Sequence, residues 1–357
     1  MNWSVIPAFL KSRTFGPLTL NQGETLSATN PENARPLVSI VIPMLNERDA
    51  IERCINSIFA QDYPADRLEI VIVDGLSDDG SQQVVTSLMK EHHFIKLLEN
   101  PTRRTPASLN IGVRHAAGDV IVILGAHTTI ERQFVSTNIK YMNELGVKCT
   151  GGTQINVGET YLQRAIGFGM GSVFGIPSAP YRFFPKKRFV DTVVYAAYKR
   201  QLFDEVGYFD EELCISEDAE FNWRIRKAGN KIFYTPEIIS YYYPRKNLFR
   251  LFKQFFNYGI FRVNVMKKHI DSVKLIHFLP PLFVATMVVL SVGGFFVPLL
   301  WKLAAVVLAL YILYIILGAF LTAGKVKKIH YVPVLPPVFA TMHISWGTGF
   351  LVGMVKK

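Results

Sequence analysis

Three long apolar runs without a charged residue fill the C-terminal part of the chain, at residues 278–300, 303–324 and 331–355. Each run reaches the roughly 20 residues that a helix needs to cross a bilayer. The runs rule out a simple soluble globule and predict a membrane domain over residues 275–357 with about three transmembrane helices. The third run contains three prolines, so a re-entrant or interfacial segment is the alternative there.

The positive charge of the chain lies beside these runs. The formal net charge is +11, but residues 245–274 hold eight Lys or Arg and one acid, and residues 275–357 hold six Lys and no acid. Residues 1–244 are therefore slightly acidic, which argues against nucleic acid as a partner and favours the anionic headgroups of membrane lipid. Phenylalanines interleave with the cations, so residues 245–274 are predicted to form a basic amphipathic interfacial segment.

The loop charges predict an orientation in the membrane. Cations precede the first apolar run and separate the second from the third, whereas Lys302 alone separates the first two. Lys and Arg favour the cytoplasmic side of a membrane. The distribution therefore predicts a multi-pass protein of the cytoplasmic (inner) membrane whose large N-terminal region faces the cytoplasm.

The region before the membrane domain alternates between two periods. Short β-branched runs at 37–42, 68–73, 94–98 and 120–124 are typical of buried parallel strands. Segments with helical spacing separate them, at 47–61, 81–91 and 106–117. Strand and helix in alternation predict an α/β domain built on a parallel sheet, over residues 37–244. Residues 1–36 have no clear period and are predicted to be an N-terminal arm.

Ligands bind at the carboxyl ends of strands in such sheets, so the residues after the first, second and fourth strands are candidates for a binding site. Residues 43–47 read PMLNE, residues 74–81 read DGLSDDGS, and residues 125–127 read GAH. No GxGxxG follows the first strand and no GxxxxGK[ST] occurs, which argues against a dinucleotide-binding domain and a P-loop protein.

Four motifs in this order resemble the family 2 glycosyltransferases, which have the GT-A fold. They are VSIVIPMLNE (38–47), EIVIVDGLSDDGS (69–81), NPTRRTPASLNIGVRHAAGDVIVIL (100–124) and SEDAEFNWRIRKAG (216–229). Within the family, the chain looks most like the bacterial glucosyltransferases of succinoglycan-type exopolysaccharide assembly. The resemblance implies a Rossmann-like nucleotide-binding sheet with an acceptor subdomain, followed here by the C-terminal transmembrane helices.

The resemblance also implies which residues bind a nucleotide-sugar donor. In the family, the acid at Asp74 binds the nucleobase, and the acid at Asp79 lies near the ribose. Further donor-side candidates are Pro43, Glu47, Arg104 and Asn110. The alternative for Asp74 and Asp79 is ordinary turn and helix-capping chemistry, and Glu47 also suits the first turn of a helix.

A divalent metal, Mg²⁺ or Mn²⁺, is implied at residues 125–127, where the family carries Asp-x-Asp. Here Gly125 replaces the first acid and His127 the second. Imidazole binds Mn²⁺ but is a poor ligand for Mg²⁺, which prefers oxygen. The metal assignment therefore depends on His127, and the alternative is that His127 is an ordinary loop residue.

Catalysis is assigned by resemblance to Asp218, with Glu217 beside it. An acceptor hydroxyl loses its proton as it attacks the anomeric carbon, so a positioned carboxylate is needed as a general base. The alternative is that these acids only stabilise a helix N-terminus. Arg224, which matches a family arginine, is a candidate for phosphate, and Gln254 and Tyr258 are candidates for the acceptor. The Arg and Trp of the processive Gln-x-x-Arg-Trp motif are replaced, which argues against processive elongation.

Together these features predict an inverting glycosyltransferase for cell-surface polysaccharide or exopolysaccharide synthesis. It would move a hexose from a nucleotide-sugar, a UDP-sugar by resemblance, to a lipid-linked saccharide. One alternative is transfer to polyprenyl phosphate itself. Another, suggested by Gly125, is a degenerate, non-catalytic membrane subunit. Polysaccharide-assembly proteins are a further class of partner for the membrane tail.

Overall fold

The structure is a computed structural model that describes residues 35–272 and 274–356. Pro36–Lys357 form one compact unit, which contains all the helices and strands of the described residues. The predicted N-terminal arm, residues 1–36, lies outside the described residues except for its last two.

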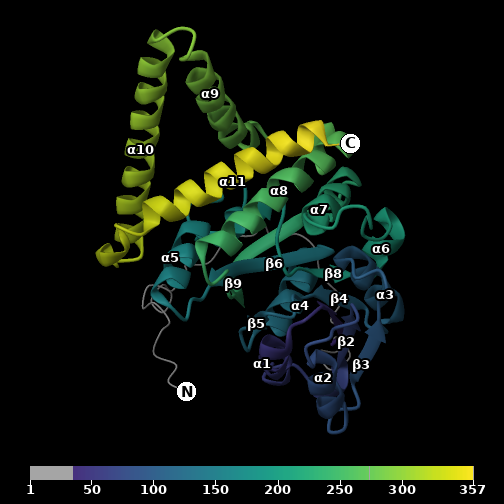
Figure 1. Cartoon of the computed structure of the whole chain (residues 1–357). Helices are drawn as coiled ribbons and strands as arrows, with labels where there is room; N and C mark the ends of the chain where they lie inside the picture. The colour runs from purple at the N-terminus through teal and green to yellow at the C-terminus, as the bar shows by residue number, and fades with distance from the viewer. Residues whose placement is uncertain (1–34, 273, 357) are drawn as a thin grey trace, which may run out of the picture. The chain divides into compact units, whose positions relative to one another are not determined.

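The N-terminal half of the sheet is parallel, with the strand order β3-β2-β1-β4 (Figure 1). Its strands are β1 (Val38–Met44), β2 (Leu68–Asp74), β3 (Ile95–Glu99) and β4 (Val120–Ile123). They are connected by α1 (Arg48–Phe59), by η3 (Ala65–Arg67) and then by α2 (Ser81–Met89) and α3 (Thr105–His115). The predicted alternation of strand and helix is confirmed to within a few residues at each end.

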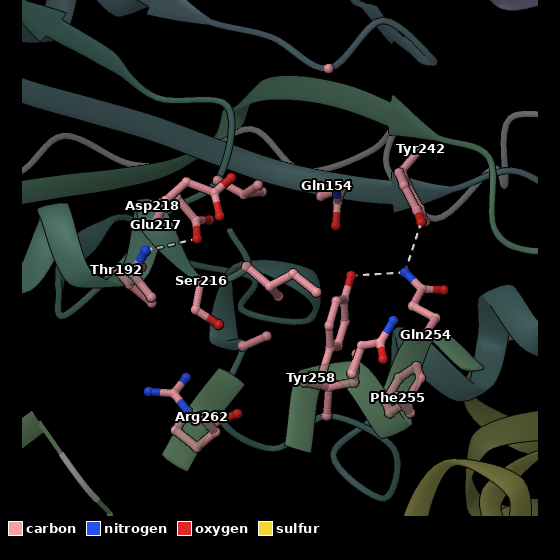
Figure 2. A pocket seen from close by; sticks show the side chains of 18 of the residues that line it. Gln154, Thr192, Ser216, Glu217, Asp218, Tyr242, Gln254, Phe255, Tyr258 and Arg262 are labelled. Carbon is pink, nitrogen blue, oxygen red and sulfur yellow. Dashed lines mark hydrogen bonds between the residues drawn. The ribbon is translucent and has the colours of Figure 1, made fainter. Parts of the chain in front are cut away.

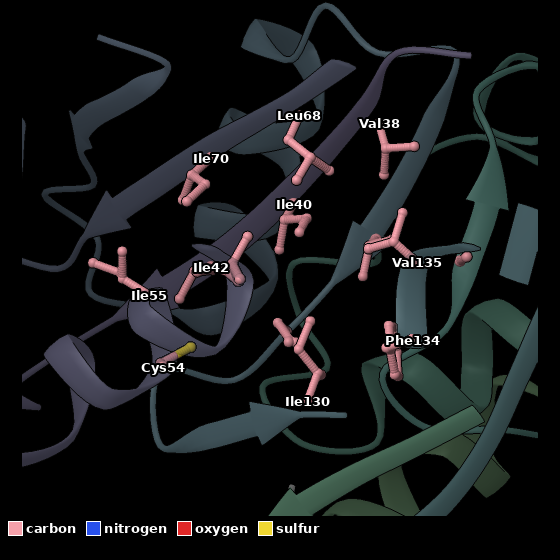
Figure 3. Packing of buried hydrophobic residues seen from close by; sticks show 14 of the residues in the cluster. Val38, Ile40, Ile42, Cys54, Ile55, Leu68, Ile70, Ile130, Phe134 and Val135 are labelled. Atoms are coloured by element: carbon pink, nitrogen blue, oxygen red, sulfur yellow. The ribbon is translucent and has the colours of Figure 1, made fainter. Parts of the chain in front are cut away.

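Successive residues of the central strand β1 point to opposite faces of the sheet. Val38, Ile40 and Ile42 pack with α1 in one buried cluster, as Figure 3 shows. Val41 packs on the other face with residues of α3. There Gly112 of α3 lies so close that an added Cβ would be 2.3 Å from a Val41 methyl. Both faces of the sheet are covered, which is why the strands are apolar throughout.

The other half of the sheet is mixed, which corrects the expectation of an all-parallel sheet. Strand β8 (Ala197–Lys199) pairs antiparallel with β4 and with β6 (Cys149–Asn156). Strand β9 (Ile232–Tyr242) pairs parallel with β6 and antiparallel with β5 (Thr128–Ile130) and β7 (Arg188–Val190). Several of these strands are only three residues long, too short for a strand period to be visible in the sequence.

Short helices join these strands and carry parts of the site. They are α4 (Phe134–Leu145), α5 (Tyr161–Met170), η4 (Pro180–Arg182), α6 (Gln201–Val206) and α7 (Glu217–Lys227). Helix α7 begins at Glu217, next to the predicted base, and a short connection joins its C-terminal end to β9.

The C-terminal part is helical. It consists of α8 (Leu248–Lys268), η5 (Ile270–Ser272), η6 (Leu275–Phe278), α9 (Leu279–Gly293), α10 (Leu299–Lys325), η7 (Ile329–Tyr331) and α11 (Leu335–Val355). Within the described residues, three helical segments are long and apolar enough to cross a membrane: 275–293, 299–325 and 335–355. The prolines of the third run stand before α11 or in its first turn, where they leave the helix unbroken.

Helix α11 lies along α8 rather than standing apart from the soluble part (Figure 1). Glycines bring the two backbones together: an added Cβ at Gly349 would be 2.0 Å from the Phe256 carbonyl oxygen, and one at Gly259 would be 2.3 Å from that of Trp346. Much of the apolar face of α8 is thus covered by α11. Phe249 and Phe252 on α8 stay exposed, and contact of this helix with a membrane surface stays a prediction.

Candidate active site

A cavity of about 760 Å³ opens at the carboxyl ends of β1, β2 and β4. These strands are neighbours, and open α/β sheets bind ligands at this edge. The residues at or just after the three strand ends that line the cavity include Pro43, Glu47, Gly75, Gly125 and His127. The cavity therefore brings together Pro43, Glu47 and His127, three of the residues that the sequence predicted for the donor and the metal.

The same cavity reaches the membrane helices. Glu217 and Asp218 of α7 line it, and so do Gln254 and Tyr258 of α8. At its membrane end it is lined by Phe283 of α9, Tyr311 and Tyr314 of α10, and Met342, His343 and Trp346 of α11. One continuous space thus connects the strand ends, the predicted base and the membrane helices.

Glu217 and Asp218 occupy the first turn of α7. Ser216, the residue before this helix, has a left-handed backbone conformation (φ 70°). The pKa of Glu217 is raised to about 8. Burial is the largest cause, and the negative charge of the Asp218 carboxylate adds to it. Burial also raises the pKa of Asp218, although the Ala219 amide and the charges of Arg262 and Arg182 partly offset it. A pKa of about 8 leaves Glu217 largely protonated near neutral pH, so we expect Asp218 to be the carboxylate of the pair that acts as a base.

Asp74, the last residue of β2, and Asp79 in the turn that follows are not among the residues that line the cavity. Asp74 is fully buried and accepts hydrogen bonds from the amide and hydroxyl of Ser77 and from Gln82. Asp79 accepts from the amides of Ser81 and Arg48. These bonds match the turn and capping alternative, and nucleotide binding by the two acids stays a prediction.

Three other predicted residues lie outside the cavity, and two of them are held in structural contacts. Asn110 exchanges hydrogen bonds with the Phe209 backbone, at 2.9 Å in each direction. Arg224 pairs with Glu220 at 2.7 Å and donates to two backbone carbonyls. Arg104 precedes α3 and does not line the cavity, whereas the neighbouring Arg103 does. The structure thus does not bring Asn110, Arg224 or Arg104 to the cavity, and it adds Arg103.

The predicted metal position consists of one imidazole and one carboxylate. His127 Nδ1 lies 2.8 Å from Glu47 Oε1. Among the described residues, no three His, Cys, Asp or Glu side chains gather into a group that could hold a metal ion. A side chain at position 125 has little room, because its Cβ would be 3.3 Å from Thr128 Oγ1 and 3.4 Å from Tyr195 Oη. The residues described at this position therefore offer two possible ligands, and metal binding by His127 stays a prediction.

Gln254 is fixed by two tyrosines in the middle of the cavity, as Figure 2 shows. Its Nε2 donates to Tyr258 Oη at 2.8 Å and to Tyr242 Oη at 3.2 Å. Its Oε1, like the Oε1 of Gln154 across the cavity, is buried without a hydrogen-bond partner among the described residues. Unpaired buried acceptors are costly, so both amides are suited to bind hydroxyl groups of a sugar.

Sequence reasoning missed several polar residues of this cavity. Arg182, Arg262, Gln154 and His277 all line it. Arg262 stands on α8 at the helical spacing of four from Tyr258, which itself follows Gln254 by four, so the sequence held a signal for it. Arg182 and Gln154 carried no such signal, because they lie on segments that only the fold brings beside Asp218.

Comparisons with known proteins bear on the family and the fold. Residues 39–207 match the family model described as glycosyl transferase family 2. The chain is 28% identical over 327 residues to the dolichyl N-acetyl-alpha-D-glucosaminyl phosphate 3-beta-D-2,3-diacetamido-2,3-dideoxy-beta-D-glucuronosyltransferase of Methanococcus voltae, covering 89% of this chain and 97% of that protein. It is 28% identical over 313 residues to succinoglycan biosynthesis protein ExoA of Rhizobium meliloti (strain 1021), covering 87% of this chain and 93% of that one.

A solved structure shows the same fold. The mannosyltransferase PcManGT from Pyrobaculum calidifontis, in complex with GDP-Man and Mn²⁺, superimposes with a TM-score of 0.58 at 20% sequence identity, covering 94% of this chain and 91% of that chain. The likeness shows that the sheet with its helices is of the GT-A type.

Proposed function

We propose that the chain transfers a hexose from a nucleotide-sugar to a lipid-linked saccharide with inversion. The match of residues 39–207 to the glycosyl transferase family 2 model and the names of the relatives support a glycosyltransferase. The observation that carries the proposal is the continuous cavity from the strand ends past Asp218 to the membrane helices. A soluble acceptor would need no such opening, whereas a lipid-linked acceptor must enter from the membrane.

The acceptor end of the reaction centres on Asp218. Its carboxylate takes the proton of the acceptor hydroxyl while that oxygen attacks the anomeric carbon of the donor sugar. The bond from that carbon to the diphosphate breaks, and the nucleoside diphosphate leaves with the electron pair. A single displacement of this kind inverts the anomeric centre. Glu217, protonated at neutral pH, keeps a second negative charge away from the base.

The donor end lies at the strand ends. Pro43, Glu47 and Gly75 line the place where the nucleotide would lie, with Asp74 and Asp79 behind them. His127 would hold a divalent metal on the donor diphosphate, and Glu47 orients its imidazole. The metal would neutralise charge that develops on the leaving group.

The names of the relatives support the substrate class. That of the Methanococcus voltae relative describes a sugar added to a dolichyl-phosphate-linked sugar, and that of the Rhizobium meliloti relative describes succinoglycan biosynthesis. The Pyrobaculum calidifontis structure contains GDP-Man and Mn²⁺. We further propose that the donor is a UDP-sugar and that the catalytic domain, residues 37–244, faces the cytoplasm. Residues 275–357 would cross the membrane three times, and polysaccharide-assembly proteins would be further partners.

The proposal is tested by sugar transfer in membranes that contain the protein. Labelled UDP- and GDP-sugars are supplied with a lipid extract of the host. We expect one donor to give a labelled lipid-linked product. If no donor gives a product and the purified protein binds neither UDP nor GDP, with or without Mn²⁺, the chain is a non-catalytic subunit instead.

Metal dependence follows from the residue at position 127. Because imidazole binds Mn²⁺ better than Mg²⁺, we expect faster transfer with Mn²⁺ than with Mg²⁺ at equal concentration. Substitution His127→Ala removes the protein ligand and is expected to lower the rate by about 10- to 100-fold. Substitution His127→Asp, which supplies oxygen, should shift the preference toward Mg²⁺. Full activity of the wild type in excess EDTA would contradict this role.

The raised pKa values predict a bell-shaped pH profile. Transfer requires ionised Asp218, and burial raises the pKa of this carboxyl group above the usual aspartate value of about 4. The transfer rate should therefore rise with pH over a range that lies above that value. Above the pKa of Glu217, about 8, Glu217 adds a second negative charge beside Asp218. This charge repels the donor diphosphate, so the rate should fall. We expect the alkaline limb to disappear in Glu217→Gln while the acidic limb remains. An unchanged alkaline limb in this variant would contradict the assignment.

A further inference from the structure

Three buried N–H groups without partners line the cavity beside Asp218. They are Arg182 Nε, Arg262 Nε and His277 Nε2, and none of them has a hydrogen-bond partner among the described residues. His277 Nδ1 accepts a hydrogen bond from the Lys274 amide at 3.2 Å, so the proton of the neutral imidazole is on Nε2. All three groups are therefore donors, and an unpaired buried donor is costly.

The Arg262 guanidinium is the most exceptional of the three. Within the described part of the chain, the structure gives it no hydrogen bond and no ion pair. Its electrostatic interactions are with Asp218 and Tyr181 of the cavity. Arg182 also interacts with Asp218, and its guanidinium donates to Asn156 Oδ1 at 3.1 Å while its Nε stays unpaired among the described residues. Two cations and an imidazole N–H thus face the cavity, and Asp218 is the acid with which both cations interact.

We propose that Arg262, Arg182 and His277 bind the phosphate of a polyprenyl-linked acceptor, on the membrane side of Asp218. The inference rests on the proposed transfer to a lipid-linked acceptor and adds where the acceptor phosphate binds. An oxyanion only accepts hydrogen bonds, which is what three unpaired donors require. The planar fork of arginine suits phosphate in particular.

The position of the donors separates the acceptor phosphate from the donor diphosphate. His277 lies at the start of the first membrane segment, and its carbonyl accepts from Trp346 Nε1 of α11 at 3.4 Å. The donor end, with Glu47 and His127, lies at the strand ends instead. The cavity therefore presents a base, then phosphate-binding groups, then apolar and aromatic side chains of the membrane helices. A lipid-linked saccharide carries its hydroxyl, phosphate and hydrocarbon in the same order.

The test measures binding without turnover. The full-length protein in phosphatidylcholine nanodiscs is titrated with undecaprenyl phosphate, with neutral undecaprenol and, separately, with UDP plus Mn²⁺. We expect the wild type to prefer the phosphate over the alcohol. Substitution Arg262→Gln should weaken undecaprenyl phosphate binding by about 10- to 100-fold, the size of a lost charge-assisted interaction, and leave UDP binding unchanged. Arg182→Gln should act in the same direction.

The matched control is Arg250→Gln, which removes the same charge from the same helix α8 at an exposed position outside the cavity. The affinities of this variant for undecaprenyl phosphate and for UDP should equal those of the wild type. Thermal unfolding of each variant distinguishes a lost contact from a lost fold, and Arg262→Lys should recover part of the affinity. The inference is overturned if Arg262→Gln weakens the binding of UDP instead, because the arginines would then bind the donor diphosphate. It is also overturned if the variant binds both ligands as tightly as the wild type.

The experiments distinguish a failure of the proposed transfer reaction from a failure of the proposed phosphate site. If no nucleotide-sugar supports transfer but undecaprenyl phosphate still binds in an Arg262-dependent way, the phosphate site holds and the transfer reaction does not. Where transfer is observed, Arg262→Gln should raise KM for the acceptor and leave KM for the nucleotide-sugar unchanged.

Discussion

Replacement of Asp218 by Asn is expected to lower the transfer rate by about 10² to 10⁴-fold, the usual contribution of a general base. Asp218 lies in the cavity between the strand ends and the membrane helices, and its carboxylate accepts a hydrogen bond from the Ala219 amide at 2.7 Å. The amide of Asn preserves the shape but cannot take the acceptor proton. Because Asp218 lies away from the nucleotide end, UDP binding by the variant should equal that of the wild type.

The assay compares labelled lipid-linked product from equal amounts of the two proteins under single-turnover conditions. Asp204→Asn, at an exposed position on α6 outside the cavity, is the matched control and should keep full activity. Equal activity of Asp218→Asn with a saccharide acceptor would remove Asp218 as the base. Activity retained only with polyprenyl phosphate, whose acceptor oxygen is already an anion, would favour transfer to that lipid instead.

Replacement of Gly349 by Leu is expected to separate α11 from α8 and to abolish the folded arrangement of the membrane domain. A Cβ at this position would lie 2.0 Å from the Phe256 carbonyl oxygen, and the obstructing atom is backbone. Close helix contacts of this kind depend on small residues. Overpacking of a well-packed interface costs about 1–3 kcal/mol or more, and here the helices must move apart.

The measurement is thermal unfolding of the detergent-solubilised protein, with transfer activity as a second readout. Gly324→Leu, near the end of the membrane helix α10, is the control because nothing lies within 4 Å of its added Cβ. We expect a large loss of Tm and activity for Gly349→Leu and little change for Gly324→Leu. Equal Tm values would show that α11 does not pack on α8 through this glycine.

Local patterns in the sequence were enough to predict the parallel half of the sheet and the membrane segments. Strands such as β1 and β2 are buried on both faces and therefore read as continuous apolar runs. The acids of α7 could be assigned because the SED motif opens a helix within a familiar order of motifs. The length of the apolar runs alone specifies helices that can cross a membrane.

The antiparallel half of the sheet and the roles of individual polar residues were decided by tertiary contacts. Strand β8 has three residues and exists because β4 and β6 lie on either side of it. Asn110 and Arg224 resemble ligand-binding residues in the sequence, but the fold directs them to the Phe209 backbone and to Glu220. Their partners are distant in sequence or on an adjacent turn, so residue type alone could not exclude them from the site.

The sequence by itself determined the fold class, the membrane segments and the position of the candidate base, because each depends on periodicity or on a contiguous motif. Only the tertiary structure showed that Arg182, Arg262 and His277 line one cavity, with both arginines near Asp218 and His277 near Arg262. They come from a short helix between sheet strands, from α8 and from the start of the first membrane segment. The physical reason is that an anion site depends on which charges remain unpaired after folding, and pairing is a property of contacts between distant segments.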